Sequence, residues 1–424
     1  MLLFSLLPVT AISLPKLPRN GAYTASGAVF VFLFIISLIL PLSVQTEELP
    51  AVQKHISNGG YALSKNGQIV YSGNLKKTFI PASTIKLITS LAALEILGPD
   101  YHFRTRFYLD RQNNLYIQGF GDPFFVSEKI DRISQIIAER GITEIHNIIL
   151  DDFAFALEGK TDGSENSKNP YDAQCSALGA NFNTLPLQVI HGAKVKSAEP
   201  QTPYLPIMGQ IGRNLSTGYH RVNINAFPDG ASISNTLLHT GQLFQTLFAK
   251  QGIRVNGEIQ HGTVPTDTPL FLDFVADESI SDLVESCLFS SSNFMANQLY
   301  LAVGVARFGL PATWEKSRKA MNNFIQNSLN LTETQIRMIE GSGLSTKNRL
   351  SPEAMILVLE KFKPYIELMP VKYGVKMKSG TLSKSGVFCY AGYFTKKGKT
   401  NPFVILLNQR KNGRDLILKL LYRQ

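Results

Sequence analysis

The run TIKLITSLAALEIL at residues 84–97 constrains this chain more than any other feature, because its apolar side chains surround a helical axis instead of forming one stripe. A helix with that pattern has to be covered by protein on all sides. Gly98 and Pro99 follow directly and supply a helix stop signal. The run therefore predicts a buried helix at the centre of its domain.

Two polar residues mark the start of this helix. Ser83 precedes the run and Lys86 lies three residues later, so both side chains project from one face at the first turn. The positive end of the helix dipole would stabilise a developing alkoxide on the serine. A neutral lysine could accept the serine proton, and burial or a second cation, which Lys378 could supply, would lower its pKa. An isolated S-x-x-K is more often a capping serine with an exposed lysine, and the apolar flank argues against that interpretation. A second copy at residues 13–16 contains proline and has no such helix.

A second motif, Ser291-Ser292-Asn293, leads into a run with helical spacing at residues 294–301. At a helix start, the Ser291 hydroxyl can relay a proton to a leaving amine, and the Asn293 carboxamide can bind a peptide backbone. Taken alone, the three residues would make a good N-cap without any chemistry. Their position between two other motifs favours the catalytic interpretation. Another S-x-N, at residues 167–169, lies in a polar stretch and is predicted to be a loop.

The third motif, Lys378-Ser379-Gly380-Thr381, is predicted to lie on an edge strand that lines a cleft. There Lys378 can hold a carboxylate and Gly380 lets a substrate approach. The backbone N–H of Thr381 can complete an oxyanion hole with that of Ser83. The surrounding residues predict an antiparallel meander of strands at 375–382, 387–394 and 402–407.

Each motif alone is weak, and another K-S-G at residues 384–386 is explained by a hairpin turn. In order, however, S-x-x-K, S-x-N and K-[ST]-G form the signature of active-site-serine penicillin-recognising enzymes. We therefore assign catalytic roles to Ser83, Lys86 and Ser291. Substrate-binding roles go to Asn293, Lys378, Ser379, Gly380 and Thr381.

At this point the chain resembles the penicillin-binding protein 4 type of D-alanyl-D-alanine carboxypeptidase/endopeptidase, a class C low-molecular-mass penicillin-binding protein. The resemblance spans roughly residues 50–410. It departs from the family at Ser379, where threonine is more usual, and the region between the first two motifs is short for the family. The matching segments beyond the three motifs are LYIQGFGDP at 115–123, NPY at 169–171, SAL at 176–178, NFN at 181–183, GSGLS at 341–345, NR at 348–349 and AGY at 391–393.

The domain organisation follows from the distance between motifs. Ser83 and Ser291 have to meet although 291 − 83 = 208 positions separate them, which indicates an inserted domain. We predict an α+β protein in which residues 47–106 and 271–424 form the catalytic domain. The resemblance implies a transpeptidase/β-lactamase-like fold there, an antiparallel sheet covered by helices. Residues 107–270 are expected to form a mostly β-containing insert, with strand-like segments at 114–119, 145–151 and 222–225 and a helical pattern around 130–140.

Composition narrows the partners. The formal charge of +10 would suit an anionic membrane surface or cell-wall polymer, whereas the scattered basic residues argue against nucleic acid binding. The three cysteines lack metal-ligand spacing, and neither a metal nor a cofactor is expected. Residues 1–46 contain an apolar stretch behind a positive flank and are expected to be either a cleaved export signal or a retained membrane anchor. Both place the catalytic domain in the periplasm or at the outer face of the cytoplasmic membrane.

The resemblance implies a serine-type D-Ala-D-Ala carboxypeptidase that acts on peptidoglycan stem peptides ending in D-Ala-D-Ala, with DD-endopeptidase activity as an option. β-Lactams would acylate the same serine and inhibit it. Two alternatives stay open: a β-lactamase or esterase on the same fold, and a non-catalytic peptidoglycan-binding protein. The sequence does not distinguish carboxypeptidase from endopeptidase activity.

Overall fold

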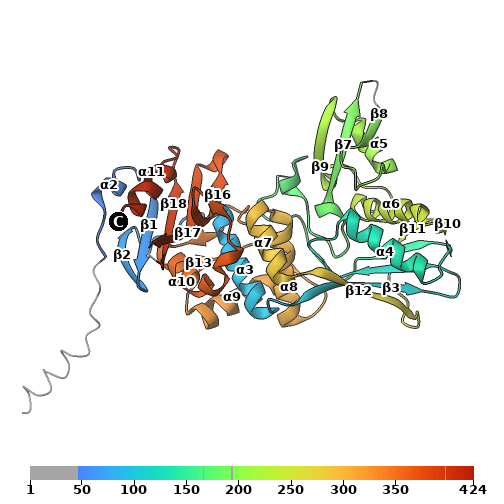
Figure 1. The fold of residues 1–424 in the computed structure, drawn as a ribbon, viewed down its shortest axis with the longest axis horizontal. Coiled ribbons are helices and arrows are strands. Elements are labelled where there is room, and N and C mark those ends of the chain that lie inside the picture. Colours follow the sequence, from blue (N-terminus) through green and yellow to red (C-terminus); the bar gives the residue numbers. More distant parts are fainter. Residues whose placement is uncertain (1–45, 166, 192–193, 397) are drawn as a thin grey trace, which may run out of the picture. The chain divides into compact units, whose positions relative to one another are not determined.

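A six-stranded antiparallel sheet carries the third motif near one edge in the computed structural model, which describes residues 46–165, 167–191, 194–396 and 398–424 (Figure 1). The predicted meander at 375–407 is confirmed as three consecutive strands of this sheet. In spatial order the strands are β15 (Val371–Lys372), β16 (Val375–Leu382), β17 (Val387–Lys396), β18 (Lys399–Asn408), β1 (Gly59–Lys65) and β2 (Gln68–Gly73).

Apolar side chains cover both faces of this sheet, because alternate residues of each strand point to opposite sides. On β17, for example, Cys389 and Ala391 join the core under one helical layer, while Tyr390 and Phe394 join the core on the other face. The first layer consists of α3 (Lys86–Ile96), α7 (Ile280–Ser290), α8 (Asn293–Phe308), α9 (Trp314–Leu329) and α10 (Pro352–Phe362). The second consists of α2 (Pro50–Gln53) and α11 (Arg414–Tyr422).

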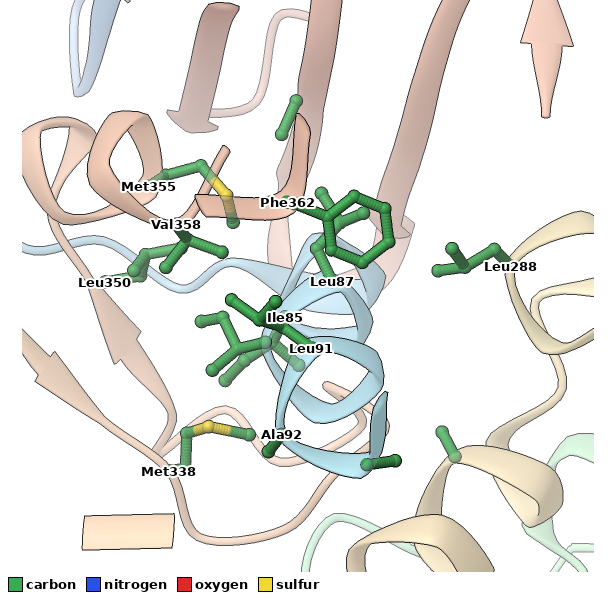
Figure 2. Close-up of a cluster of buried hydrophobic side chains, with 14 of the residues drawn as sticks. Ile85, Leu87, Leu91, Ala92, Leu288, Met338, Leu350, Met355, Val358 and Phe362 are labelled. Atoms are coloured by element: carbon green, nitrogen blue, oxygen red, sulfur yellow. The ribbon is translucent and has the colours of Figure 1, made fainter. Parts of the chain in front are cut away.

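Helix α3 is the buried helix that the sequence predicts. Every residue from Lys86 to Leu94 is buried, and apolar side chains from surrounding segments, including Leu288, Met338 and Phe362, pack around it (Figure 2). Gly98 follows the helix with a φ of +96°, the left-handed conformation in which glycine commonly ends helices. The first turn differs from the prediction, since residues 82–85 form a 3₁₀ helix, η1 (Ala82–Ile85), directly before α3.

The segment between the first two motifs has its own core and sheets. A five-stranded sheet consists of β11 (Ile259–His261), β6 (Ile148–Asp151), β4 (Leu115–Gly119), β3 (His102–Leu109) and β12 (Leu270–Ser279), in that order. A three-stranded sheet consists of β8 (Lys194–Ser197), β7 (Thr184–Ile190) and β9 (Gly218–Asn223). Short pairs join β5 (Glu144–Ile145) to β10 (Arg254–Val255), and β13 (Ile336–Arg337) to β14 (Arg349–Leu350) in the catalytic part. The helices of the insert are α4 (Ser127–Glu139), α5 (Pro206–Gly212) and α6 (Asn235–Lys250).

The two long strands β3 and β12 pair with each other and run between the two cores. Phe103 and Ala276 belong to the core around α3, whereas Phe107 and Phe274 belong to the core of the insert. We therefore propose that the domain border crosses both strands, at 103–107 and 274–276, close to the expected 106/107 and slightly beyond the expected 270/271.

The expected export segment falls almost wholly on residues 1–45, outside the described part of the chain. Among the residues that the structure does describe, no helix has the length and apolar character needed to cross a membrane.

Candidate active site

The turn at residues 81–86, called the nucleophile turn below because it carries the candidate nucleophile Ser83, has a strained and closely packed backbone. Ala82 has a φ of +45°, a left-handed conformation that non-glycine residues rarely adopt and that often marks a functional site. In the 3₁₀ turn that follows, side chains three residues apart eclipse one another. Lys86 consequently lies directly over Ser83, and its Nζ donates a hydrogen bond to Ser83 Oγ at 2.9 Å. The predicted pairing of these two side chains is present, on a tighter turn than expected.

Three acceptors from three segments surround the amine of Lys86. Besides Ser83 Oγ, its Nζ donates to Asn293 Oδ1 at 2.8 Å and to the backbone oxygen of Ser342 at 2.6 Å. Three acceptors match the three N–H groups of a protonated lysine. When the amine is neutral, its lone pair can accept a proton only from Ser83, because the Asn293 and Ser342 oxygens carry no hydrogen. The geometry therefore selects Ser83 as the proton donor to Lys86.

Burial prepares Lys86 for this exchange. The side chain is fully buried, and desolvation lowers its pKa from 10.5 to about 8, against smaller opposing effects of Cys287 and Glu340. Lys378 is nearly as buried, and its pKa falls to about 7 because of desolvation first and the Lys86 charge second. The sequence attributed the lowered pKa of Lys86 partly to Lys378, but burial dominates at both residues and the larger shift falls on Lys378.

The second motif divides its work among its three residues. Ser292 caps α8, its hydroxyl accepting from Met295 N at 3.2 Å, so this serine does what a bare N-cap cluster would do. Ser291 has a left-handed backbone with a φ of +58°, and its Oγ accepts a hydrogen bond from Lys378 Nζ at 2.8 Å instead of capping the helix. Asn293 Oδ1 accepts from Lys86, while its Nδ2 donates to Tyr171 O at 3.1 Å. An amide nitrogen carries two N–H groups, and among the described residues only this one contact is seen, so one N–H can serve a substrate carbonyl.

The third motif lies on β16 where that strand forms the sheet edge, since β15 pairs only with Val375 and Lys376. Alternation places Lys378 and Gly380 toward α3, and Ser379 and Thr381 toward the opposite face. Gly380 lies against the nucleophile turn: a Cβ there would lie 2.9 Å from Ser83 N and 2.7 Å from Pro81 O. The first reason for glycine is thus the approach of the protein's own backbone, in addition to the substrate access that the sequence suggested.

Four of the predicted site residues line one cleft with a volume of about 640 Å³. Ser83, Ser291, Asn293 and Thr381 reach its surface, and Lys86 and Lys378 lie buried beneath it. The insert supplies part of the wall, with Gly163, Glu165, Tyr171 and Asp172. Across the described residues, no group of three or more His, Cys, Asp or Glu is placed to hold a metal ion.

The structure adds three residues that the motifs did not reveal. Tyr171 orients Asn293 through its backbone oxygen. Arg414, at the start of α11, donates to Thr381 Oγ1 at 2.8 Å and to Gly380 O at 3.0 Å, and so places a permanent cation beside Thr381, which lines the cleft. Glu340 is buried beside the GSGLS loop. The family resemblance pointed to the neighbourhoods of Tyr171 and Glu340, whereas nothing in the sequence pointed to Arg414.

The family-like segments outside the three motifs hold the insert against the catalytic helices. Gln298 of α8 donates from Nε2 to Gly121 O at 3.2 Å and to Ser176 O at 2.9 Å, which joins the GFGDP and SAL segments to the helix that follows the second motif. Ser345 and Lys347 donate to the Asp162 carboxylate at 2.6 and 2.5 Å. These hydrogen bonds therefore fix the insert against the segments that surround the site.

The other two copies of the motifs stay outside this site. Residues 167–169 lie in a loop, as predicted, and residues 384–386 lie at the β16–β17 turn, where Gly386 has a φ of +66°. The copy at residues 13–16 lies outside the described residues. Cys287 and Cys389 are buried among apolar side chains and serve as small core residues.

Comparison with known proteins agrees with this architecture. In sequence, the chain is 25% identical to a D-alanyl-D-alanine carboxypeptidase from an Actinomadura species over 74% of this chain, and it spans only 65% of that relative's length. It is 23% identical to the D-alanyl-D-alanine carboxypeptidase DacB of Haemophilus influenzae, over 92% of this chain and 93% of that protein.

In structure, the crystal structure of penicillin binding protein 4 from Haemophilus influenzae matches with a TM-score of 0.69 at 20% identity, covering 88% of this chain and 99% of the other. A predatory endopeptidase from Bdellovibrio bacteriovorus matches with a TM-score of 0.52 at 17% identity, covering 86% and 91%. These likenesses establish the α+β, transpeptidase-like fold with an inserted domain. The model of the D-Ala-D-Ala carboxypeptidase 3 (S13) family matches residues 44–372, more than three quarters of the sequence, and the chain belongs to that family.

Proposed function

We propose that this protein is a serine-type D-alanyl-D-alanine carboxypeptidase that cleaves peptidoglycan stem peptides through an acyl-enzyme. The observation that carries the proposal is the fully buried Lys86 amine, whose three hydrogen-bond partners in the described part of the chain include one that can give it a proton, Ser83. A serine hydroxyl activated by a neutral amine is a nucleophile for acyl transfer. Membership of a carboxypeptidase family supports the choice of a D-Ala-D-Ala substrate.

The residues then have the following roles. Ser83 Oγ attacks the carbonyl of the penultimate D-alanine while Lys86 takes its proton. The N–H groups of Ser83 and Thr381 stabilise the oxyanion. Ser291 passes a proton to the departing amine, and its contact with Lys378 supplies a route for that proton. Asn293 holds the substrate backbone, and water releases the acyl group.

The substrate carboxylate is expected to act on the two lysines. Lys378, with Ser379 and Thr381, forms its binding site, and Arg414 adds a charge that does not titrate. A bound carboxylate stabilises the protonated form of Lys378, whose pKa is otherwise about 7. A cationic Lys378 in turn favours a neutral Lys86. Binding of a substrate with a C-terminal carboxylate therefore prepares the base.

DD-endopeptidase activity is a second candidate, which the structural likeness to a Bdellovibrio endopeptidase and the open 640 Å³ cleft favour. In a cross-link the scissile bond again follows a D-alanine carbonyl, so the same residues would serve. Substrates of this kind lie in the cell wall. We accordingly propose an exported protein in the periplasm or at the outer face of the cytoplasmic membrane, with residues 1–46 as signal or anchor.

The proposal is tested by measuring whether benzylpenicillin acylates Ser83. After benzylpenicillin is added to residues 47–424, the intact mass should show a persistent one-to-one adduct that maps to the Ser83 peptide. Ser83→Ala should abolish both the adduct and D-alanine release while its circular dichroism stays unchanged. A transient adduct with consumption of penicillin would indicate a β-lactamase. If no adduct forms and peptidoglycan still binds, the protein is a wall-binding protein.

A further inference from the structure

Glu340 is a buried carboxylate whose hydrogen bonds all go to one loop. Its Oε2 accepts from Ser342 N at 2.8 Å and Ser342 Oγ at 2.6 Å. Its Oε1 accepts from Gly343 N at 2.8 Å, Ser345 N at 3.2 Å and Asn348 Nδ2 at 2.8 Å. Among the described residues, no lysine, arginine or histidine forms an ion pair with it. A buried charge that is held by five donors and no cation is unusual.

The loop that Glu340 organises is part of the nucleophile's surroundings. The Ser342 backbone oxygen is one of the three acceptors of Lys86 Nζ, at 2.6 Å. Gly343, at a φ of +87°, packs so closely on the turn before Ser83 that a Cβ would lie 2.1 Å from Ala82 O. A displacement of this loop would therefore move the lysine and the serine together.

The adjacent residue, Gly341, is fixed from both sides. Its backbone N–H donates to Asn297 Oδ1 of α8 at 2.7 Å, and its oxygen accepts from Thr89 Oγ1 of α3 at 2.7 Å. Helices α3 and α8 thus hold one end of the loop, and Glu340 holds the rest. Since α3 carries Lys86 and α8 begins with Asn293, this arrangement links the first two motifs.

We propose that Glu340 is a positioning residue for the catalytic lysine: its carboxylate fixes the Ser342 oxygen that aims the Lys86 amine at Ser83, and its negative charge balances the buried cations. This inference rests on the proposed acylation of Ser83. A role in loop packing alone would use only the hydrogen bonds and would not depend on charge.

The charges around the site define what the negative charge does. Lys86 and Lys378 supply the two buried cations, and Arg318 of α9 acts on the same region, since both it and Glu340 influence the pKa of Tyr300. Cys287 faces both lysines from α7, and Cys175 of the insert lies within the field of Glu340. For Lys86, the Glu340 charge raises the pKa against the effect of burial. Loss of that charge should therefore make Lys86 easier to deprotonate.

The test compares Glu340→Gln and Glu340→Asp with wild type in the acylation of Ser83 by benzylpenicillin, followed by intact mass from pH 5.5 to 9.5. We expect Glu340→Gln to lower the maximal acylation rate by about 10²-fold, as for a displaced catalytic group. The acid limb of its pH–rate profile, where the rate rises with pH, should shift to lower pH. Glu340→Asp keeps the charge, so its acid limb should stay in place while its rate falls less.

Asp110→Asn is the matched control. Asp110 also organises a loop, accepting from Gln112 N at 2.9 Å and Asn114 N at 2.8 Å, but in the β3–β4 turn of the insert. This variant should acylate like wild type. Circular dichroism and thermal unfolding check that each variant is folded.

The outcomes separate the hypotheses. If Glu340→Gln is acylated slowly but the acid limb of its pH profile does not move, the carboxylate acts through loop packing alone and the proposal is overturned. A wild-type acylation rate and pH profile for Glu340→Gln would overturn it as well. If Glu340→Gln does not fold, Glu340→Asp decides on positioning: an unchanged acylation rate overturns the proposal, and a reduced rate in a variant with wild-type thermal unfolding supports it, because the shorter side chain cannot hold the Ser342 oxygen in place. If wild type itself is not acylated at Ser83, the proposed function fails, whatever Glu340 does.

Discussion

Replacement of Gly380 by alanine should disable the site through a contact between backbones. The added methyl group would lie 2.7 Å from Pro81 O and 2.9 Å from Ser83 N, whereas ordinary contacts begin at 3.4 Å. The shortfalls are 3.4 − 2.7 = 0.7 Å and 3.4 − 2.9 = 0.5 Å. Neither neighbour is a side chain that could turn aside, so β16 or the nucleophile turn has to shift by about half an ångström.

That shift falls on the expected oxyanion hole. The two donors are the N–H groups of Ser83 and Thr381, on the two segments that would be pushed apart. Useful donors lie within a window of only about 0.4 Å around the oxyanion. We therefore expect Gly380→Ala to reduce the rate of acylation by about 10²-fold. The overpacking should also lower the free energy of unfolding by about 1–3 kcal/mol.

The assay is the rate of adduct formation with benzylpenicillin, together with D-alanine release from a stem pentapeptide. Gly262→Ala is a suitable control, because its methyl group would meet only the Ile149 Cγ2 methyl, at 3.1 Å, in the insert. The control should keep the wild-type rate. If Gly380→Ala is folded and acylates at that rate as well, the two segments accommodate the methyl group without displacing the oxyanion donors, contrary to the prediction.

Two further predictions concern charge. In the proposed mechanism the active form has a neutral Lys86, with a pKa of about 8, and a cationic Lys378, with a pKa of about 7. The second-order acylation rate should therefore rise as Lys86 loses its proton, fall as Lys378 loses its proton, and peak near pH 7.5. Because the two lysines interact, both limbs of the profile belong to the pair and not to either residue. A flat profile from pH 6 to 9 would contradict this prediction. Arg414→Ala removes the cation beside Thr381. It should weaken binding of a peptide with a free C-terminal carboxylate by about 1.5–3 kcal/mol and leave the C-terminally amidated peptide unaffected; equal losses for both peptides would assign Arg414 to structure.

The sequence predicted those parts of the fold in which local pattern and tertiary environment agree. Helix α3 is apolar on all sides and is buried on all sides. Alternation and turn residues located β16 and its meander. In the insert, β4, β6 and α4 lie where strand-like and helical patterns were expected.

Other features depend on contacts that no local pattern shows. The 3₁₀ turn at η1 has the same three-residue spacing between Ser83 and Lys86 as an α-helix, and Gly380 and Gly343 of distant segments press against it. Helix α6 was not predicted, although 16 residues form it. Its buried face includes polar residues such as Asn235 and Gln242, which weakens an apolar stripe.

Tertiary contacts also explain why the motifs did not identify Arg414 and Glu340. Arg414 and Glu340 touch the site from segments without a catalytic signature, and their importance comes from what they contact. Arg414 becomes relevant because α11 begins beside Thr381. Glu340 becomes relevant because the GSGLS loop returns to Lys86. A motif lists the groups that react, whereas these two residues act on the position or charge of those groups.

The buried lysines also connect the chemistry to the helix that constrains the fold. A pKa of about 8 in place of 10.5 corresponds to a net cost of roughly 3 kcal/mol for holding Lys86 as a cation in the folded protein. For Lys378, with a pKa of about 7, the net cost is roughly 5 kcal/mol, and the neighbouring Lys86 charge contributes to it along with burial. A domain of ordinary stability has only about 5–15 kcal/mol to spare. The burial of apolar side chains all around α3 offsets this cost and also keeps water away from Lys86. An amphipathic helix would leave Lys86 near water, with a pKa near its ordinary value of 10.5. The apolar run at residues 84–97 is therefore both a central part of the domain core and the reason why the pKa of its lysine is low enough for the proposed role as a base.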